Sequence, residues 1–337
     1  MIMQHGHVVA LVLAALAPCV ALRADPPAAI EPAPEVVVPG VWLIPGGVPA
    51  DRQPDGNSVI FAAPDGLVVV DTGRHPWHRE AILALARAQD AAIVAIVNTH
   101  WHLDHVSGNP ALRAAYPGLR VYATDAIDGA LGGFLAQSAK DAAAYLDDPQ
   151  IPQAMRDDIR ADLLTIQNGA NLRPDVVLDA PGERLLGGRG LEIHRVTDAV
   201  TAGDLWLYDA ANHLAVLGDL VTLPAPYLDT ACPQGWADAL RQVDEVPFEL
   251  AIPGHGPVMS HAQFALYRKS FEAFIGCANS ARPAGECASA WADAVLPLLG
   301  NDAPGRQRAQ DTAAYYVGML RANGGRSRYC GSPPRVR

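Results

Sequence analysis

The segment that decides the fold is residues 100–105, HWHLDH. It follows an apolar, β-branched stretch, residues 92–97, whose pattern predicts a buried strand. Three histidines and one aspartate therefore stand together where a strand ends. Imidazole and carboxylate groups are ligands that zinc prefers, and alternate side chains of an extended segment point to the same side. The motif predicts a site for one or two metal ions.

The rest of the chain alternates between short apolar runs and stretches with helical spacing. We expect a long helical segment at about 124–170 and helices from 262 onward. Interleaved strands and helices, with hairpins in both halves, favour a layered α/β sandwich. The other expected elements are strands at 41–44, 58–62, 67–70, 121–123, 176–178, 191–196, 205–208, 214–217 and 250–252, and helices at 77–88 and 236–243.

Four motifs in order resemble the metallo-β-lactamase superfamily. HWHLDH, followed by Gly108-Asn109, resembles its first metal motif, and PGHG at 253–256 resembles its last. Between them the family has an acid that bridges two metals, matched here by Gly218-Asp219. DTG at 71–73 resembles the strand end that supports the metal-binding loop. The resemblance implies a four-layer αββα sandwich over residues 40–260, with the helical insertion at 124–170 and a C-terminal helical extension, 261–337, packed on the same domain.

The resemblance also implies a ligand set. Asp71 is expected to support the metal-binding loop, and Asp104 is expected to orient the nucleophile or accept its proton besides binding metal. The cofactor implied is zinc, as one or two ions. The expected metal ligands are His100, His102, Asp104, His105, Asp219 and His255.

One position departs from the family pattern. The family normally carries a further histidine in a His-Thr-x-Gly-Asp setting, and here Val200 stands in its place before Thr201. Valine cannot bind a metal, so the site of His100 and His102 loses a ligand. The sequence leaves three outcomes open: one metal only, a surrogate ligand such as Asp198, His75 or His194, or a shifted alignment. We favour a weakened or altered first site.

The function implied is a metal-dependent hydrolase that uses metal-activated water on an ester, thioester, lactone or phosphoester. Alternatives are a β-lactamase, a non-catalytic metal- or ligand-binding protein, and an iron-dependent redox enzyme. The acid at position 219 places β-lactamase second, since penicillin-cleaving members more often carry cysteine or serine there. The loop at 222–235 forms either part of a substrate wall or a rigid connector held by Cys232.

The N-terminus and the cysteines indicate export. An apolar run at 8–16, followed by small residues and a Pro-rich stretch, is typical of a signal peptide over 1–24 with a linker over 25–39. Besides Cys19 in the predicted signal peptide, the chain has four cysteines. This even number favours two disulfides, Cys277–Cys287 and Cys232–Cys330, and a location in the periplasm or outside the cell.

The expected partner is a small-molecule substrate. The net charge of −11 and the absence of a basic cluster argue against nucleic acid. No stable membrane insertion is expected after signal cleavage, and the sequence does not indicate an oligomeric state.

Overall fold

The computed structural model describes residues 33–331 except residue 50. The predicted signal peptide, residues 1–24, lies outside the described residues. The predicted linker, 25–39, needs a correction in its described part, because Glu35–Val38 forms strand β1 at the edge of a sheet. Three successive valines give this segment a high strand propensity, and β1 pairs with the next strand in antiparallel register.

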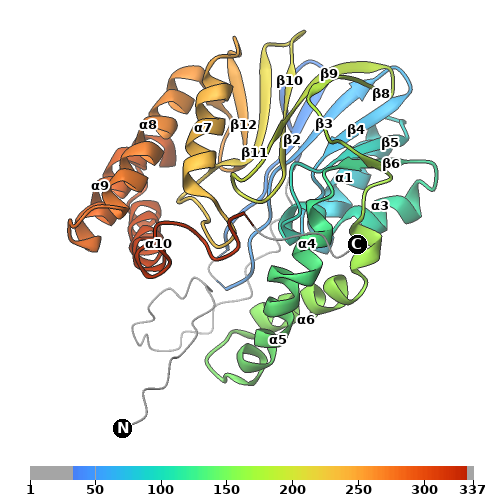
Figure 1. The fold of residues 1–337 in the computed structure, drawn as a ribbon. Coiled ribbons are helices and arrows are strands. Elements are labelled where there is room, and N and C mark those ends of the chain that lie inside the picture. The colour runs from blue at the N-terminus through green and yellow to red at the C-terminus, as the bar shows by residue number, and fades with distance from the viewer. Residues whose placement is uncertain (1–32, 50, 332–337) are drawn as a thin grey trace.

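Two mixed sheets face each other at the centre of the molecule (Figure 1). In the first sheet the early strands form antiparallel hairpins and the later ones run parallel. In the second, only β11 and β12 pair in parallel. The first sheet contains β1, β2 (Val41–Ile44), β3 (Ser58–Ala63), β4 (Gly66–Val70), β5 (Ile93–Val97), β6 (Arg120–Ala123) and β7 (Val176–Val177). The second contains β8 (Gly182–Leu186), β9 (Arg189–Val196), β10 (Asp204–Asp209), β11 (Leu214–Thr222), β12 (Leu250–His255) and β13 (Met259–Ser260).

Helices cover the outer face of each sheet and complete the αββα sandwich. α1 (Pro76–Ala88) and α3 (Asn109–Ala115) lie on the first sheet, where they share an apolar cluster with its outward residues. α7 (Pro233–Asp244), α8 (His261–Ala278), α9 (Ala284–Val295) and α10 (Ala303–Ala322) share a larger cluster with the second sheet. A third cluster fills the space between the sheets. Burial on both faces explains why the central strands read as continuous apolar runs.

The segment at 124–170 contains three helices: α4 (Ala126–Gly132), α5 (Phe134–Asp147) and α6 (Gln153–Gln167). A 3₁₀ turn, Gly169–Leu172, leads back to the sheet. In the view of Figure 1 these helices and α10 lie at the same end of the sandwich, below the sheets. Within the described part of the chain, no helix is both long and apolar enough to cross a membrane.

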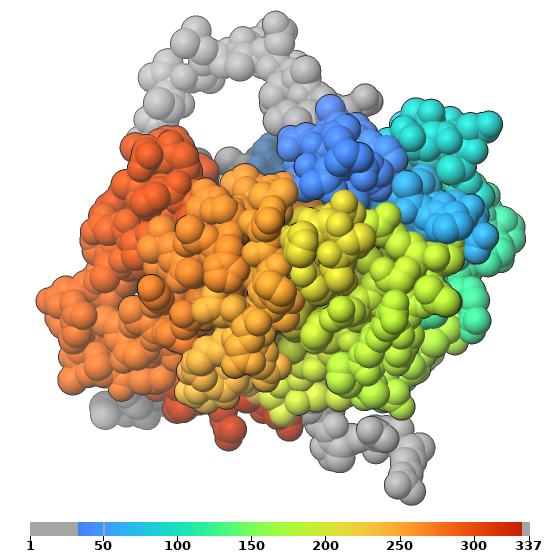
Figure 2. Space-filling view, turned by 90° about the horizontal axis from the view of Figure 1, so that it is seen from above, coloured from blue at the N-terminus to red at the C-terminus, as the bar shows by residue number. Residues whose placement is uncertain are grey.

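The C-terminal segment packs against the main domain. Cys277–Cys287 and Cys232–Cys330 are both present as disulfides, as the sequence predicted. The second one ties the end of the described chain to the loop before α7, and the Ser327 amide donates to the carbonyl of Ala231 beside it. In Figure 2 the strand segment near residue 210 lies between the orange C-terminal helices and the blue N-terminal strands.

Candidate metal centre

The candidate ligands converge from four elements at one edge of the sandwich. His100 and His102 follow β5, and the short helix α2 (Leu103–Val106) carries Asp104 and His105. Asp219 lies within β11, and His255 ends β12. Ligand atoms of these side chains form two groups of three, each group within 4.8 Å: His100, His102 and Asp219, and Asp104, His105 and His255. We call them the first and the second half-site.

The second half-site is tightly packed. His255 Nε2 lies 3.1 Å from Asp104 Oδ2 and 3.4 Å from His105 Nε2. His105 Nε2 is also 3.1 Å from Asp219 Oδ1. All four side chains are buried. Three of these side chains form one candidate ligand group, and Asp219 Oδ1 lies beside it, so the half-site offers up to four donors of the kinds that zinc accepts.

The first half-site has fewer protein ligands. His100 Nε2 lies 3.5 Å and His102 Nδ1 lies 3.8 Å from Asp219 Oδ2. The two oxygens of Asp219 therefore face different half-sites, Oδ1 the second and Oδ2 the first. Three protein ligands plus a free position is the arrangement of catalytic zinc sites.

Unpaired polar atoms support the assignment of a metal to both half-sites. Among the described residues, neither carboxylate oxygen of Asp219 has a hydrogen-bond partner, and His100 Nε2 has none either. All three atoms are buried, and a buried polar group without a partner costs free energy. A cation between the facing oxygens and nitrogens would satisfy them, so the residues present fit a divalent metal.

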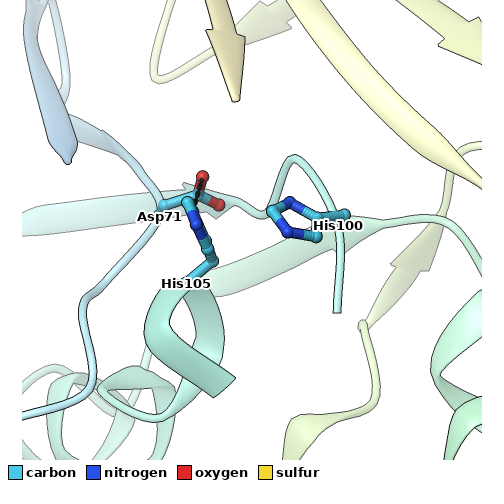
Figure 3. Close-up of side chains that lie close together, drawn as sticks. All are labelled: Asp71, His100 and His105. Carbon is cyan, nitrogen blue, oxygen red and sulfur yellow. Dashed lines mark hydrogen bonds and ion pairs between the residues drawn. The ribbon is translucent and has the colours of Figure 1, made fainter. Parts of the chain in front are cut away.

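Asp71 supports the centre and does not form a third half-site. Its Oδ1 accepts from the Thr99 amide at 2.8 Å, and its Oδ2 accepts from Thr99 Oγ1 at 2.6 Å and faces His105 Nδ1 at 2.8 Å. Figure 3 shows Asp71 beside His105, with His100 on the loop next to them. Because its oxygens are already engaged, Asp71 orients the His105 ring so that Nε2 points to the metal position.

Val200, at the position of the missing histidine, is packed in the apolar core, and Thr230 connects its backbone to His102. Val200 is 1% exposed and belongs to the apolar cluster between the second sheet and its helices. Thr230 donates from Oγ1 to the Val200 carbonyl at 2.8 Å and lies 3.0 Å from His102 Nε2. Thr230 therefore fixes the His102 ring with Nδ1 toward the metal position, but it supplies no ligand to the ion.

None of the surrogate ligands named from the sequence reaches the centre. The ring of His194 stacks on Trp206 and belongs to no candidate ligand group among the described residues. The Asp198 side chain is exposed and belongs to no candidate ligand group. Both ring nitrogens of His75 face carboxylates, Nδ1 at 2.5 Å from Asp55 and Nε2 at 3.1 Å from Asp158. Asp219, through its two oxygens, is what links the first half-site to the second.

Arg74 is a further residue at the centre that the sequence did not single out. Its guanidinium lies 3.7 Å from Asp104 Oδ1, the oxygen that faces away from His255, and pairs with Asp162 of α6. Its Nε donates to the Pro54 carbonyl at 3.0 Å. The helical insertion is thus connected to a candidate ligand through one half-buried cation. Only the fold brings residues 88 positions apart into contact, so no local sequence pattern could reveal this link.

Two glycines let the backbone approach the ligands closely. A Cβ atom at position 254 would come within 2.0 Å of Asp219 Oδ1, and one at position 56 within 2.4 Å of the His105 ring. Any side chain at Gly254 or Gly56 would displace a ligand. This requirement accounts for the glycine before His255 in the last motif.

The two carboxylates of the centre are held in the ionised form that a metal ligand requires. Burial opposes ionisation of Asp219, but the charges of His105 and His255 outweigh it and hold its pKa well below the usual value. Burial likewise opposes ionisation of Asp104, and His105 and its other neighbours lower its pKa. Burial and the nearby His100 lower the pKa of His102, which keeps this ring neutral and able to bind metal.

Comparison with known proteins establishes the family. The chain matches the metallo-beta-lactamase superfamily model over residues 52–275, and it belongs to that superfamily. Among solved structures, it resembles a metallo-beta-lactamase from Pontibacter korlensis with a TM-score of 0.52 and 18% identity, covering 71% of this chain and 98% of the other. It also resembles a double mutant of the sec-alkyl sulfatase PisA1 with a TM-score of 0.58 and 15% identity, covering 90% of this chain and 52% of the other. At these identities the likeness shows the fold.

Similarity to curated proteins is limited to short segments. An atrochrysone carboxyl ACP thioesterase of Aspergillus fumigatus is 34% identical over 88 residues, which are 26% of this chain and 28% of the relative. A hydroxyacylglutathione hydrolase of Gloeobacter violaceus is 54% identical over 41 residues, 12% of this chain and 16% of the relative. The chain thus matches less than a third of the length of these relatives.

Proposed function

We propose that this protein is an exported, zinc-dependent hydrolase with a dinuclear centre, and that its substrate is a thioester or ester. The observation that carries the proposal is the position of Asp219. It presents one carboxylate oxygen to each half-site, and both oxygens lack hydrogen-bond partners among the described residues. Such a residue can hold two ions together even though Val200 provides no ligand.

The metal ions would be held unequally. Asp104, His105 and His255 with Asp219 Oδ1 would hold one ion, and His100 and His102 with Asp219 Oδ2 would hold the other. Bound zinc supplies a nucleophile at neutral pH, because it lowers the pKa of a coordinated water to about 7.

The side chains divide the remaining work. Asp71 and Thr230 hold the rings of His105 and His102 in orientation. Asp104, held on one oxygen by Arg74, is placed to orient the attacking water and accept its proton. The water oxygen then forms a bond to the carbonyl carbon, the C–S or C–O bond breaks, and the leaving group takes a proton. The products are a carboxylic acid and a thiol or alcohol.

The relatives favour thioesters over β-lactams. The two curated relatives named above are an ACP thioesterase and a hydroxyacylglutathione hydrolase, and both names point to thioester substrates. An acid at position 219, in place of cysteine or serine, agrees with that choice. Lactones and phosphoesters remain within reach of the same centre, because each presents an electrophilic atom to water.

A paired metal and substrate measurement tests the proposal. The full chain is purified without chelator, its zinc content is measured, and hydrolysis of phenyl thioacetate, 4-nitrophenyl acetate and a chromogenic cephalosporin is compared. We expect about two zinc ions per chain and faster hydrolysis of the thioester than of the other two substrates. A chelator should abolish this activity, and added zinc should restore it.

An Asp104→Ala variant should be inactive but folded, whereas the exposed Asp157→Ala should match the wild type. Turnover of the cephalosporin alone would support the β-lactamase alternative, and zinc without any turnover the non-catalytic one. Iron would support a redox enzyme.

The two disulfides support the proposal that the protein is exported. Both predicted pairings are present in the structure, and disulfides persist in oxidising compartments. Cell fractionation combined with the intact mass of the recovered protein tests this. A protein found in the cytosol at full mass would contradict it.

A further inference from the structure

A cavity of about 440 Å³ adjoins the candidate metal centre. His255 of the second half-site lines one part of it, and the C-terminal segment around Leu298 lines another. The loop between β2 and β3, with Gly46, Gly47 and Val48, forms a further wall. Its volume falls within the range of about 300–1,000 Å³ that is common for small-molecule sites.

The wall between these parts is apolar. Leu223 and Leu298 are buried, with 4% exposure each, and both face the cavity. Val48 is one of the few large apolar side chains that remain exposed, at 38%, and it lies in the loop at the edge. An apolar lining beside a metal ligand suits a hydrocarbon group attached to the bond that is cleaved.

Arg308 of α10 is the one Lys, Arg, Asp or Glu side chain among the described residues lining the cavity. Among the residues that the structure describes, its one charged partner is Asp302 Oδ2, at 3.7 Å, which is longer than a hydrogen bond. The same oxygen of Asp302 already accepts from the Gly305 amide at 2.6 Å and caps α10. The donors of the Arg308 guanidinium are therefore free to bind an anion.

We propose that this cavity is the substrate site and that it selects an ester or thioester bearing an apolar arm that ends in an oxyanion. The scissile carbonyl lies toward His255, the apolar arm contacts Leu223 and Leu298, and the terminal carboxylate or phosphate binds Arg308. A guanidinium binds both kinds of oxyanion through paired N–H groups. The proposal rests on the proposed hydrolase function and narrows its substrate class.

Three hydroxamates test the proposal through binding, without requiring turnover. Hexanehydroxamate, the monohydroxamate of adipic acid and 5-phosphonopentanehydroxamate share a zinc-binding end but differ in the opposite end. Binding to the zinc-loaded full chain is measured by calorimetry. We expect at least one anionic compound to bind about fivefold more tightly than hexanehydroxamate, because a partly exposed ion pair contributes a gain in affinity of about this size. The tighter of the two anionic compounds identifies a carboxylate or a phosphate end.

Substitutions assign the preference to one side chain. Arg308→Gln should remove the preference and leave hexanehydroxamate binding unchanged, and Arg308→Lys should keep part of it. Arg306→Gln is the matched control, since Arg306 lies on the same helix, pairs with Asp293 and is absent from the cavity wall. Equal binding of the three compounds to the wild type, or a preference that survives in Arg308→Gln, would overturn the proposal. So would zinc-loaded protein that binds none of them. A chain that takes up no zinc would instead contradict the proposed function.

Discussion

The two half-sites differ in how completely the chain builds them. The second has two histidines and two carboxylate oxygens, and His105 is held from behind by Asp71. The first has two histidines and one oxygen, and its remaining neighbour, Val200, is packed into apolar core. We therefore expect the second half-site to bind metal more tightly, and the first to depend on it through Asp219.

The supports of the half-sites also come from different parts of the fold. Arg74, beside the second, is held by Asp162 of the helical insertion. Thr230, beside the first, lies in a loop tied to the C-terminal tail by Cys232–Cys330 and by the contact of Ser327 with Ala231. The helical insertion thus contacts the support of the second half-site, and the C-terminal tail contacts the support of the first.

The largest effect is expected from removing the shared ligand. Asp219→Ala leaves the facing nitrogens of His100 and His105 without their common carboxylate, so both half-sites weaken together. We expect hydrolysis to fall by more than about 100-fold, beyond the range for residues that only support ligands. Zinc content, measured by elemental analysis, should fall below two per chain. Retention of two tightly bound ions, with an unchanged circular dichroism spectrum, would show that Asp219 does not bridge.

Restoring the missing ligand should make the half-sites more alike. In Val200→His an imidazole starts from the backbone whose carbonyl Thr230 contacts, beside His102. We expect zinc affinity of the first half-site to rise by about tenfold or more, measured by chelator competition, while the second stays unchanged. Val200→Leu, which adds volume without a ligand, is the control. If both variants alter affinity equally, the effect comes from packing, and the position is not the vacant ligand position.

Arg74 should affect the second half-site selectively. Arg74→Gln removes the cation that holds Asp104 Oδ1 and leaves the half-buried Asp162 without its partner. We expect zinc affinity of the second half-site to drop about 10- to 100-fold, the range for residues that orient ligands. Arg74→Lys should recover part of it, and Arg87→Gln at the exposed end of α1 should have no effect. An equal drop at both half-sites would show that Arg74 does not act selectively on the second one.

Much of the fold was predictable from local patterns. The strand expected at 41–44 matches β2, and the αββα class and the family follow from motifs whose residues are close in sequence. The sequence did not predict β8, which lies at the edge of its sheet. Leu185 in this strand is 74% exposed, so β8 lacks the continuous apolar pattern of the central strands.

The candidate site was only partly predictable, for a different reason. Asp104 and His105 stand in one motif, whereas Arg74, Thr230 and Arg308 contribute through contacts that span much of the chain. Their residue types are common and carry no spacing signal. The valine at position 200 could be read as a lost ligand, but only the geometry of the strand ends shows that the two oxygens of Asp219 face different histidines.

The smallest effect is expected at the anchor of the insertion and depends on pH. Asp158 of α6 accepts from Arg52 and faces His75, both beside the segment that carries Arg74. Burial opposes ionisation of Asp158, yet the hydrogen bonds from His75 and Arg52 outweigh it and lower its pKa to about 2. Burial lowers the pKa of His75, but its contacts with Asp158 and Asp55 outweigh this effect and raise it above the usual value.

These two shifts define a pH window. The contribution of Asp158 is complete above its unfolded pKa of about 3.9 and is lost as pH falls through 2. That of His75 is complete below about 6.5 and is lost as pH rises through its higher folded pKa.

Asp158→Asn should therefore cost most between about pH 4 and 6.5, by about 3 kcal/mol of unfolding free energy, the scale for breaking a buried ion pair. Denaturant unfolding at several pH values measures it. Asp157→Asn, whose exposed pair with Arg160 is worth about 0.5 kcal/mol or less, is the control on the same helix. A cost that does not vary with pH would mean that packing, and not the charged pair, anchors α6 beside the second half-site.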